Sequence, residues 1–200
     1  MTVFPSSIET TRLRLVDLDP DEDAGAVNAP ILDTFDTLHP FMLFAEKPPM
    51  VEETRAALAK KKEGRARGIF YNYGIVVKEN NTMIGLCAIS CLRSYIGDRI
   101  RNQVDSPSYK NPWLISYWMN KRYENRGYMT EACTALLERG VLDLGIDCFL
   151  ADVKPNNEKS AGLLKRLGFE LAATAMMTNL GRRSDWPSKV PCDVYRKMNT

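Results

Sequence analysis

Short stretches in which apolar and polar residues alternate recur along the chain and predict β-strands. In residues 11–18, TRLRLVDL, the alternation is typical of a strand with one buried face. Residues 72–92 contain two β-rich segments joined by Glu-Asn-Asn-Thr, which predicts a hairpin. Residues 112–120 and 147–154 predict two more strands, and another two follow towards the end of the chain, the last of them at DVYRKM.

A second pattern, with apolar residues every three or four positions, predicts helices between these strands. Asp19 and Pro20 suit the N-cap and the first position of a helix. Residues 31–44 are apolar and interrupted by proline, which predicts a short helix and a loop, and residues 48–68 predict a longer helix. The helix that follows residue 127 has one apolar face, formed by Cys133, Leu136, Leu137, Gly140, Val141 and Leu144.

The order of these elements is β, α, α, β, β, β, α, β, α, β, β. It predicts an α+β fold with a mixed, mostly antiparallel central sheet of six to seven strands flanked by helices. A β-α-β crossover is expected around residues 114–153. No repeat or linker divides the chain, so we expect residues 1–200 to form a single domain.

Composition narrows the class of protein without naming a function. Hydrophobic residues make up 44% of the chain and charged residues 26%, as in ordinary globular proteins. No secretory signal and no apolar run long enough for a membrane span is present, so we expect a soluble, cytoplasmic protein with no membrane partner. The odd number and wide spacing of the cysteines predict free, buried thiols at Cys87, Cys91, Cys133, Cys148 and Cys192.

The basic run KKKEGRAR, residues 60–67, raises the possibility of a nucleic-acid partner. The formal net charge of the chain is only +2, however, and no aromatic residue interleaves the run for base stacking. Lysine and arginine are also favoured near helix C-termini. We therefore interpret the run as a solvated helix face and expect no nucleic-acid partner.

The turn before the helix at residue 128 has the features of an anion site. The sequence YENRG, residues 123–127, places Gly127 directly before the helix and Arg126 beside it. The first N–H groups of a helix lack intrahelical acceptors, and with the helix dipole they favour an anion such as pyrophosphate. An ordinary packed turn has the same pattern, and neither a P-loop nor a G-x-G-x-x-G motif is present.

A second constellation lies thirty residues after Gly127, in PNNEKSAGLLKRLGFEL. Asn157 is expected to cap a helix and to place Ser160 on its first turn, near the mouth of the same pair of strands. Gly168 then ends that helix, and a strand follows.

Together, ENRGYM (124–129) and NEKS with LGF (157–169) resemble motifs of the GNAT superfamily of acyl-CoA-dependent N-acetyltransferases. The family's pyrophosphate motif is Q/R-x-x-G-x-G/A, and its next motif is N-x-x-S/A followed by a helix and Gly-Phe. The segments GYMTEA and NNEKSAGLLKRLGFEL are similar to the branch that includes the ribosomal-protein N-terminal acetyltransferases. The resemblance covers nearly the whole chain and is strongest over residues 112–170.

The resemblance implies that acetyl-CoA is the co-substrate, that no metal takes part, and that a primary amine attacks the thioester directly in a ternary complex. It also implies a bulge in the central strand that presents backbone groups to the pantetheine arm, although simple strand packing is the alternative for Trp118. The residues expected to bind acetyl-CoA are Trp118, Met119, Asn120, Arg126, Gly127, Tyr128, Met129, Thr130, Asn157 and Ser160.

Three positions depart from the family pattern. Glu124 stands where Gln or Arg is usual, and Met129 stands where Gly or Ala is usual. Many relatives carry a tyrosine as general acid one turn after the Ser or Ala of the second motif, where this chain has Leu164. We expect Ser160 to take over as hydrogen-bond donor to the departing thiolate. Leu164 and Glu124 keep open an alternative, a catalytically degenerate module that binds acyl-CoA as a sensor or scaffold.

The proton acceptor and the acceptor site are less defined by the sequence. Asp152 and Glu131 are the candidate bases, and a chain of water molecules is an equal alternative. The amine site is expected to include His39, Phe41 and Tyr195, although a lone histidine beside proline is also typical of a packing residue. We expect residues 94–111 to lie over this side of the cleft.

The sequence leaves the partner of the reaction open. A small molecule and a protein N-terminus both qualify as the amine-bearing acceptor, and the chain is expected to be a monomer or a homodimer.

Overall fold

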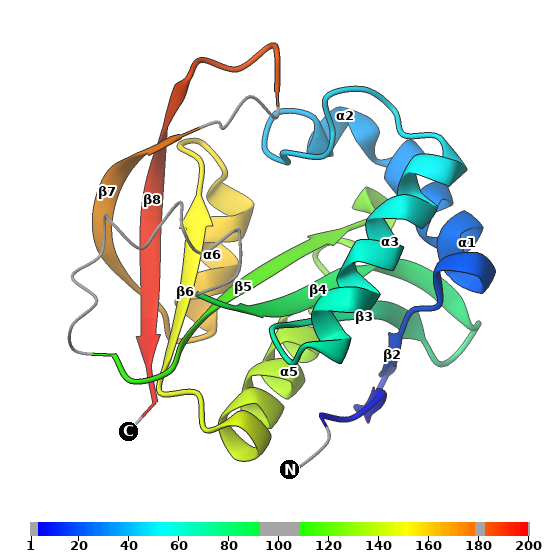
Figure 1. Cartoon of the computed structure of the whole chain (residues 1–200), viewed down its shortest axis with the longest axis horizontal. Helices are drawn as coiled ribbons and strands as arrows, with labels where there is room; N and C mark the ends of the chain where they lie inside the picture. Colours follow the sequence, from blue (N-terminus) through cyan, green and yellow to red (C-terminus); the bar gives the residue numbers. More distant parts are fainter. Residues whose placement is uncertain (1–3, 93–108, 179–182, 200) are drawn as a thin grey trace.

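The computed structural model describes residues 4–92, 109–178 and 183–199 (Figure 1). The expectation for residues 94–111 therefore falls mostly outside the described residues. The strands are β1 (Ser7–Glu9), β2 (Leu13–Asp17), β3 (Phe70–Val77), β4 (Thr82–Cys91), β5 (Pro112–Met119), β6 (Cys148–Val153), β7 (Glu170–Thr178) and β8 (Lys189–Met198). The helices are α1 (Pro20–Asp33), α2 (Phe35–Leu38), α3 (Val51–Ala66), the 3₁₀ helix η1 (Lys121–Tyr123), α5 (Tyr128–Leu144) and α6 (Glu158–Arg166).

The strands form one sheet in the order β1-β2-β3-β4-β5-β6-β8-β7. Every neighbouring pair is antiparallel except β5 and β6, which are parallel and joined by the crossover helix α5. The predicted α+β class and the crossover are confirmed. The described sheet has eight strands rather than six to seven, because the three-residue strand β1 is too short to produce a pattern of alternation.

Local sequence signals account for most helix boundaries. Asp19 caps α1, its carboxylate accepting hydrogen bonds from the backbone of Asp21 and Glu22, and Pro20 is the first helical residue. The helix continues through Pro30 to Asp33, so the first residues of the stretch expected as a separate short helix belong to α1. The prediction for residues 48–68 is confirmed by α3.

Helices cover both faces of the sheet (Figure 1). The helices α5 and α6 pack on one face, where Leu136, Phe149 and Leu164 belong to the largest core cluster. The helices α1 and α3 cover the other face over β3 to β5, with Val27 and Leu58 in their core. The five cysteines are reduced thiols, as predicted, and all but the half-buried Cys91 are buried.

The sheet divides between β5 and β6. These two strands pair only from Pro112 with Cys148 to Leu114 with Leu150. Beyond this point β5 stays paired with β4 as far as Met119, whereas β6 stays paired with β8 as far as Val153. Figure 1 shows the two strands running apart from their common start. The fork exposes one edge of each strand in the middle of the sheet.

Two kinds of feature are absent from the described ranges. None of the helices there is long and apolar enough to cross a bilayer. The same residues contain no group of three or more His, Cys, Asp or Glu side chains that are placed to hold a metal ion.

Candidate active site

A cleft of about 1230 Å³ occupies the fork between β5 and β6. Both diverging strands line it, through Ile115 to Met119 on one side and Ala151 to Val153 on the other. The turn before α5, the first turn of α6 and the inner face of α3 complete its walls. The cleft therefore gathers segments from almost the full length of the chain around the unpaired strand edges.

The turn at residues 124–130 meets the geometric requirements of an anion site. Asn125 and Gly127 both have left-handed backbone conformations, with φ of 60° and 77°. Gly127 is the N-cap of α5 and provides no side chain to cap it. The N–H groups of Tyr128, Met129 and Thr130 thus begin the helix without a side-chain acceptor among the described residues. A turn of this kind concentrates backbone donors and the positive end of the helix dipole.

Arg12, directly before β2, contacts this turn, and sequence reasoning did not anticipate the contact. Its Nη1 donates to the carbonyl of Arg126 at 2.9 Å, and its guanidinium lies 4.6 Å from the centre of the Tyr128 ring. Its Nε donates to Glu131 Oε2 at 2.7 Å. The only sequence signal was the position of Arg12 in a strand, which does not specify a contact more than a hundred residues away.

Glu131 takes part in the same contact between α5 and the residues before β2. Its carboxylate accepts from the Thr10 hydroxyl at 2.6 Å and from the backbone N–H of Arg12 at 2.8 Å, in addition to the Arg12 side chain. Burial alone would raise the pKa of Glu131, but these hydrogen bonds outweigh it and lower the pKa. Glu131 is also absent from the cleft lining. Its geometry is that of a residue that fixes α5 to β2, and does not support the predicted role as base.

Glu124, the acidic departure from the family motif, lines the cleft and forms an ion pair with Lys159 on α6. The prediction assigned the compensation of its charge to Arg126, whose guanidinium instead lies 5.5 Å from the centre of the Tyr123 ring. The Glu124–Lys159 pair links the turn before α5 to the first turn of α6. It thereby neutralises a negative charge that would otherwise repel a phosphate.

Ser160 lies at the centre of a small hydrogen-bonded group. Asn157 caps α6, as predicted, and its Oδ1 accepts from the Ser160 N–H at 3.2 Å. The Ser160 hydroxyl lies 2.9 Å from the hydroxyl of Tyr117 on β5. Burial raises the pKa of Tyr117 well above its ordinary value, so this phenol stays protonated at neutral pH. Leu164, one turn further on, is completely buried in the main core.

Tyr117 is a candidate functional residue that sequence reasoning missed. Its neighbours at alternate positions, Trp113 and Ile115, pack in the core that lies under α5 and α6. Strand alternation therefore directs Tyr117 towards α6 and directs Trp118 to the opposite face, where it packs with α1 and α3. This period-two pattern was present in the sequence and was sufficient to place Tyr117 on the same face as Trp113 and Ile115, but not to name Ser160 as its partner.

The remaining residues predicted to bind acetyl-CoA divide into two groups. Those that line the cleft are Trp118, Met119, Gly127, Met129, Thr130, Asn157 and Ser160. The side chains of Arg126 and Tyr128 are not part of the lining. Asn120 differs most from its prediction, since its N–H donates to the Ile84 carbonyl, its own carbonyl accepts from the Tyr123 N–H, and its amide donates to Asp33.

The expected bulge in the central strand is also not seen. The ladder between β4 and β5 runs from Gly85 with Met119 to Cys91 with Trp113 without a register shift. The divergence of β5 from β6 exposes the strand edge instead, so that backbone groups of β5 reach the cleft without a bulge.

The candidates for the amine side of the cleft separate clearly. Asp152 is exposed on β6 and lines the cleft, and Phe41 lines it as well. Tyr195 is 5% exposed, belongs to the main core and is absent from the lining, so it does not support the predicted acceptor role. The register explains the difference, because Tyr195 pairs with Ala151, one position away from Asp152, and therefore faces the other side of the sheet.

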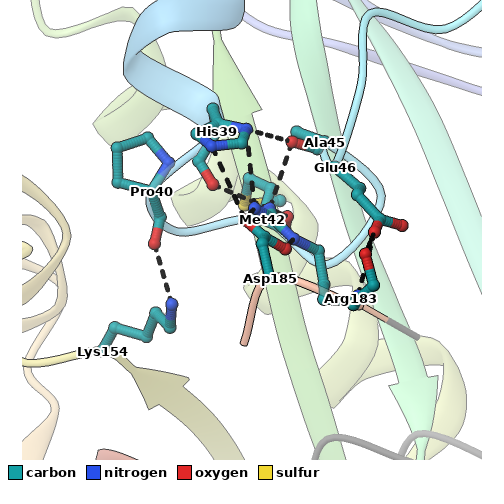
Figure 2. A network of polar contacts seen from close by, with 9 residues as sticks. His39, Pro40, Met42, Ala45, Glu46, Lys154, Arg183 and Asp185 are labelled. Atoms are coloured by element: carbon teal, nitrogen blue, oxygen red, sulfur yellow. Dashed lines mark hydrogen bonds and ion pairs between the residues drawn. The ribbon is translucent and has the colours of Figure 1, made fainter. Parts of the chain in front are cut away.

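His39 belongs to a polar network that joins two distant segments (Figure 2). Its Nδ1 lies 2.8 Å from the Ala45 carbonyl, and its Nε2 lies 3.7 Å from Asp185 Oδ2. Arg183, whose side chain is fully buried, donates from Nη1 to the carbonyls of His39, Met42 and Ala45 and binds Asp185 through Nε and Nη2. We call this group of five residues the Arg183 network.

Lys154 adds a second link beside the Arg183 network. Its Nζ donates to the Pro40 carbonyl at 2.8 Å and lies 3.0 Å from the centre of the Trp186 ring. Burial, with the nearby charge of Arg183, lowers the pKa of Lys154 to about 8. Residues 39–45 are thus fastened to β6 and to residues 183–186. His39 is held in this wall and is not among the cleft-lining residues, which agrees with the packing alternative.

Comparison with known proteins identifies the family. Residues 12–170 match the family model described as an acetyltransferase (GNAT) domain. The chain belongs to the GNAT acetyltransferase family. The match includes the turn before α5, the Ser160–Tyr117 pair and the forked strands, so the family region contains the candidate site apart from Trp186 and the β8 residues Val190 and Cys192.

Individual relatives are distant. The chain is 24% identical over 117 residues to the uncharacterized N-acetyltransferase YnaD of Bacillus subtilis, a match that covers 58% of each chain. The chain thus spans less than two thirds of that relative's length. The ribosomal L7/L12 alpha-N-protein acetyltransferase RimL, solved with coenzyme A, has a TM-score of 0.74 at 18% identity, covering 98% of this chain and 97% of its own. The microcin C7 self-immunity acetyltransferase MccE, solved with acetyl-CoA and AMP, has a TM-score of 0.75 at 14% identity and 99% coverage of both chains.

Proposed function

We propose that the protein transfers an acetyl group from acetyl-CoA to a primary amine by direct attack in a ternary complex. The observation that carries the proposal is the combination, in one cleft, of an uncapped helix N-terminus at Gly127 and the hydrogen-bonded pair Ser160–Tyr117. Membership of the GNAT family and the coenzyme A complexes of fold neighbours support the same donor. No covalent intermediate is required, because a thioester is already activated.

The donor is expected to enter from the α5 and α6 side of the sheet. Its pyrophosphate would accept hydrogen bonds from the N–H groups at Gly127 to Thr130, aided by the helix dipole. Its pantetheine arm would lie along the unpaired edge of β5 towards Trp118 and Met119. The Glu124–Lys159 pair keeps this path free of uncompensated negative charge.

The Ser160–Tyr117 pair suits the stabilisation of the leaving group. When the amine attacks the carbonyl carbon, the C–S bond breaks and negative charge develops on sulfur. The Ser160 hydroxyl can donate a hydrogen bond to that sulfur while the Tyr117 hydroxyl donates to Ser160 Oγ, so the pair stabilises the departing thiolate while both hydroxyls keep their protons. Because Ser160 lies in the first turn of α6, the positive end of that helix dipole also favours the negative charge on the sulfur.

The amine must lose a proton before or during attack. Asp152 is the cleft carboxylate placed on the strand opposite Trp118 and Met119, and we assign it as the acceptor of that proton, directly or through water. An α-amine, with a pKa of about 7.7–8.0, needs less help than a lysine amine near about 10.4. The exposed position of Asp152 is therefore better matched to an α-amine or another weakly basic amine.

The test is an unbiased panel of amines with acetyl-CoA, followed by thiol release and by mass spectrometry of the products. We expect thiol release above the rate of hydrolysis for at least one class of amine, with a mass increase of one acetyl group. Acetyl-CoA binding without acceleration by any amine would overturn the proposal.

That outcome would favour a second function, a sensor or scaffold that binds acyl-CoA. The burial of Leu164 at the position where relatives often have their acid is the observation that supports it. Calorimetry with acetyl-CoA and with coenzyme A adds a second distinction, because a sensor of acylation state should discriminate strongly between the two.

A further inference from the structure

Lys61 occupies an unusual position on α3. Residues Thr54, Leu58, Lys61 and Arg65 recur at helical spacing and form the face of α3 that meets the sheet. Thr54 and Leu58 are buried, and the Arg65 side chain is only 15% exposed. Lys61 is partly buried on the same stripe and lines the cleft. The basic run at residues 60–67 is therefore not a uniform solvated face.

Two other cations of this run, the exposed Lys62 and the mostly buried Arg65, have acidic partners. Lys62 pairs with Asp19 at 2.6 Å, and Arg65 pairs with Asp17 at 2.9 Å. Lys61 makes no hydrogen bond or ion pair with any residue of the described ranges. Burial lowers its pKa to about 8. A cation sheltered from water without a counterion is unfavourable, and a bound anion would relieve that cost.

Asn72 places a second unpartnered polar group in the same cleft. It is 7% exposed, and its neighbours in β3, Tyr71 and Tyr73, belong to the core under α5 and α6. Alternation along the strand therefore directs Asn72 to the face covered by α3, where it lines the cleft with Lys61 and Phe70. Within the described part of the chain, its side-chain amide has no hydrogen-bond partner. An amide N–H and an ammonium are both donors to an oxyanion.

Among the described residues, no acidic side chain that lines the cleft forms a hydrogen bond or an ion pair with Lys61. Glu53 accepts from the Met50 N–H and pairs with Lys47, and Glu124 pairs with Lys159. The remaining cleft surface near Lys61 is apolar, formed by residues such as Leu58 and Phe70. The pattern, one cation and one amide in an apolar recess, is typical of a ligand subsite.

We propose that Lys61 and Asn72 form a subsite for an anionic group, a carboxylate or a phosphate, carried by the amine that is acetylated. The subsite belongs to the acceptor and not to the donor, because Lys61 projects from the helix layer opposite α5 and α6, where the pyrophosphate turn lies. The inference rests on the proposed function, since it names the acceptor class of that same cleft. The acceptor is then a molecule that bears both a primary amine and an anionic oxygen group.

The experiment compares matched acceptor amines that differ in one charge. One pair is an ω-amino carboxylic acid and its amide, and the other is an aminoalkyl phosphate and the parent amino alcohol, each in several chain lengths. We expect kcat/KM for thiol release to favour the anionic member of at least one pair by about 10- to 100-fold, the usual strength of a charged hydrogen bond. Which pair shows the preference distinguishes a carboxylate from a phosphate.

Variants at two adjacent positions provide the test and its control. In Lys61→Met, the ratio of kcat/KM between the anionic and the neutral amine of each pair should fall close to one, while the affinity for acetyl-CoA stays unchanged. Lys60→Met, at an exposed position of the same helix, should keep the preference of the original protein. A preference that survives in Lys61→Met, or the absence of any preference among amines that are turned over, would overturn the proposal.

A measurement without turnover separates this inference from the proposed function. With saturating coenzyme A present, an amine-acylating reagent should label Lys61, and the anionic acceptors should slow that labelling without affecting Lys60. Protection of Lys61 in a protein that acetylates no amine would support the subsite while the proposed function fails. The subsite is wrong if these acceptors give no protection, or if coenzyme A alone protects Lys61.

Discussion

The hydroxyls of Ser160 and Tyr117 lie 2.9 Å apart in the cleft, and this contact gives the first prediction. Ser160→Ala should lower kcat by about 10- to 100-fold, because it removes a charge-assisted hydrogen bond that forms mainly in the transition state. Tyr117→Phe should lower kcat by about threefold to tenfold, since Ser160 keeps its own hydroxyl but loses its donor. Steady-state rates and calorimetric affinity for acetyl-CoA provide the measurement.

A structural role for this pair predicts a different result. If Ser160 only supports the start of α6, Ser160→Ala lowers the melting temperature and leaves kcat per folded molecule unchanged. Tyr109→Phe is the matched control, because it also removes a phenol contact, a partly buried one with Arg196, but lies outside the cleft. It should affect stability alone.

The sheltered charge of Lys61 gives a prediction about stability and pH. Burial lowers the pKa of Lys61 from 10.5 to about 8, so the protonated form is favoured more in the unfolded chain than in the folded one. The resulting cost to folding is complete below about pH 8 and fades as the pH rises towards 10.5. Lys61→Met should therefore raise the free energy of unfolding by about 1 kcal/mol at pH 7 and by less at pH 10. Denaturant unfolding at both pH values checks this, with Lys60→Met expected to show no pH-dependent gain.

At the scale of elements, the turn before α5 carries the sharpest test. Gly127→Val places a β-branched residue at a φ of 77° and brings its Cβ within 3.3 Å of Arg12 Nη2. We expect a loss of about 1–2 kcal/mol of stability from the backbone conformation. We also expect a loss of about tenfold or more in coenzyme A affinity, because the backbone donors no longer meet the pyrophosphate closely.

The other end of the same helix supplies the control. Gly145 caps the C-terminus of α5 with a φ of 61°, and a Cβ there meets no atom within 4 Å. Gly145→Val should cost similar stability without changing coenzyme A affinity. Equal affinity losses in both variants would mean that strain in α5, and not the turn itself, governs binding.

Elements with local signals were predictable from the sequence, and contacts between distant elements were not. Asp19 and Asn157 marked the starts of α1 and α6 because capping depends on residues within one helical turn. The contact of Arg12 with Glu131 and the burial of Arg183 depend on the assembled sheet, so no short pattern contains them. Tyr117 was partly predictable, since strand alternation indicated the face of the sheet on which it lies but not its contact with Ser160.

At the scale of the whole molecule, the fork between β5 and β6 leaves two parts of the sheet that share only three residue pairs. One part carries α1 and α3, and the other consists of β6, β8 and β7. The Arg183 network and Lys154 reconnect these parts, because they fasten residues 39–45, which follow α2, to residues 183–186 and to the end of β6 (Figure 2). Residues 39–45, which we expect to form the wall of the cleft on the amine side, are thus held from two directions.

This arrangement predicts that Arg183 controls the amine site more than the acetyl-CoA site. Arg183→Lys keeps the charge but cannot donate simultaneously to the carbonyls of His39, Met42 and Ala45, so we expect a loss of about 2–3 kcal/mol in stability from unsatisfied buried groups. The KM for the amine should rise about fivefold or more, because the wall loosens, while the KM for acetyl-CoA changes little. Arg67→Ala, an exposed position, should alter neither constant. Equal rises in both constants would contradict this assignment, since a general loss of structure, rather than a local loss of the acceptor wall, would then explain the effect.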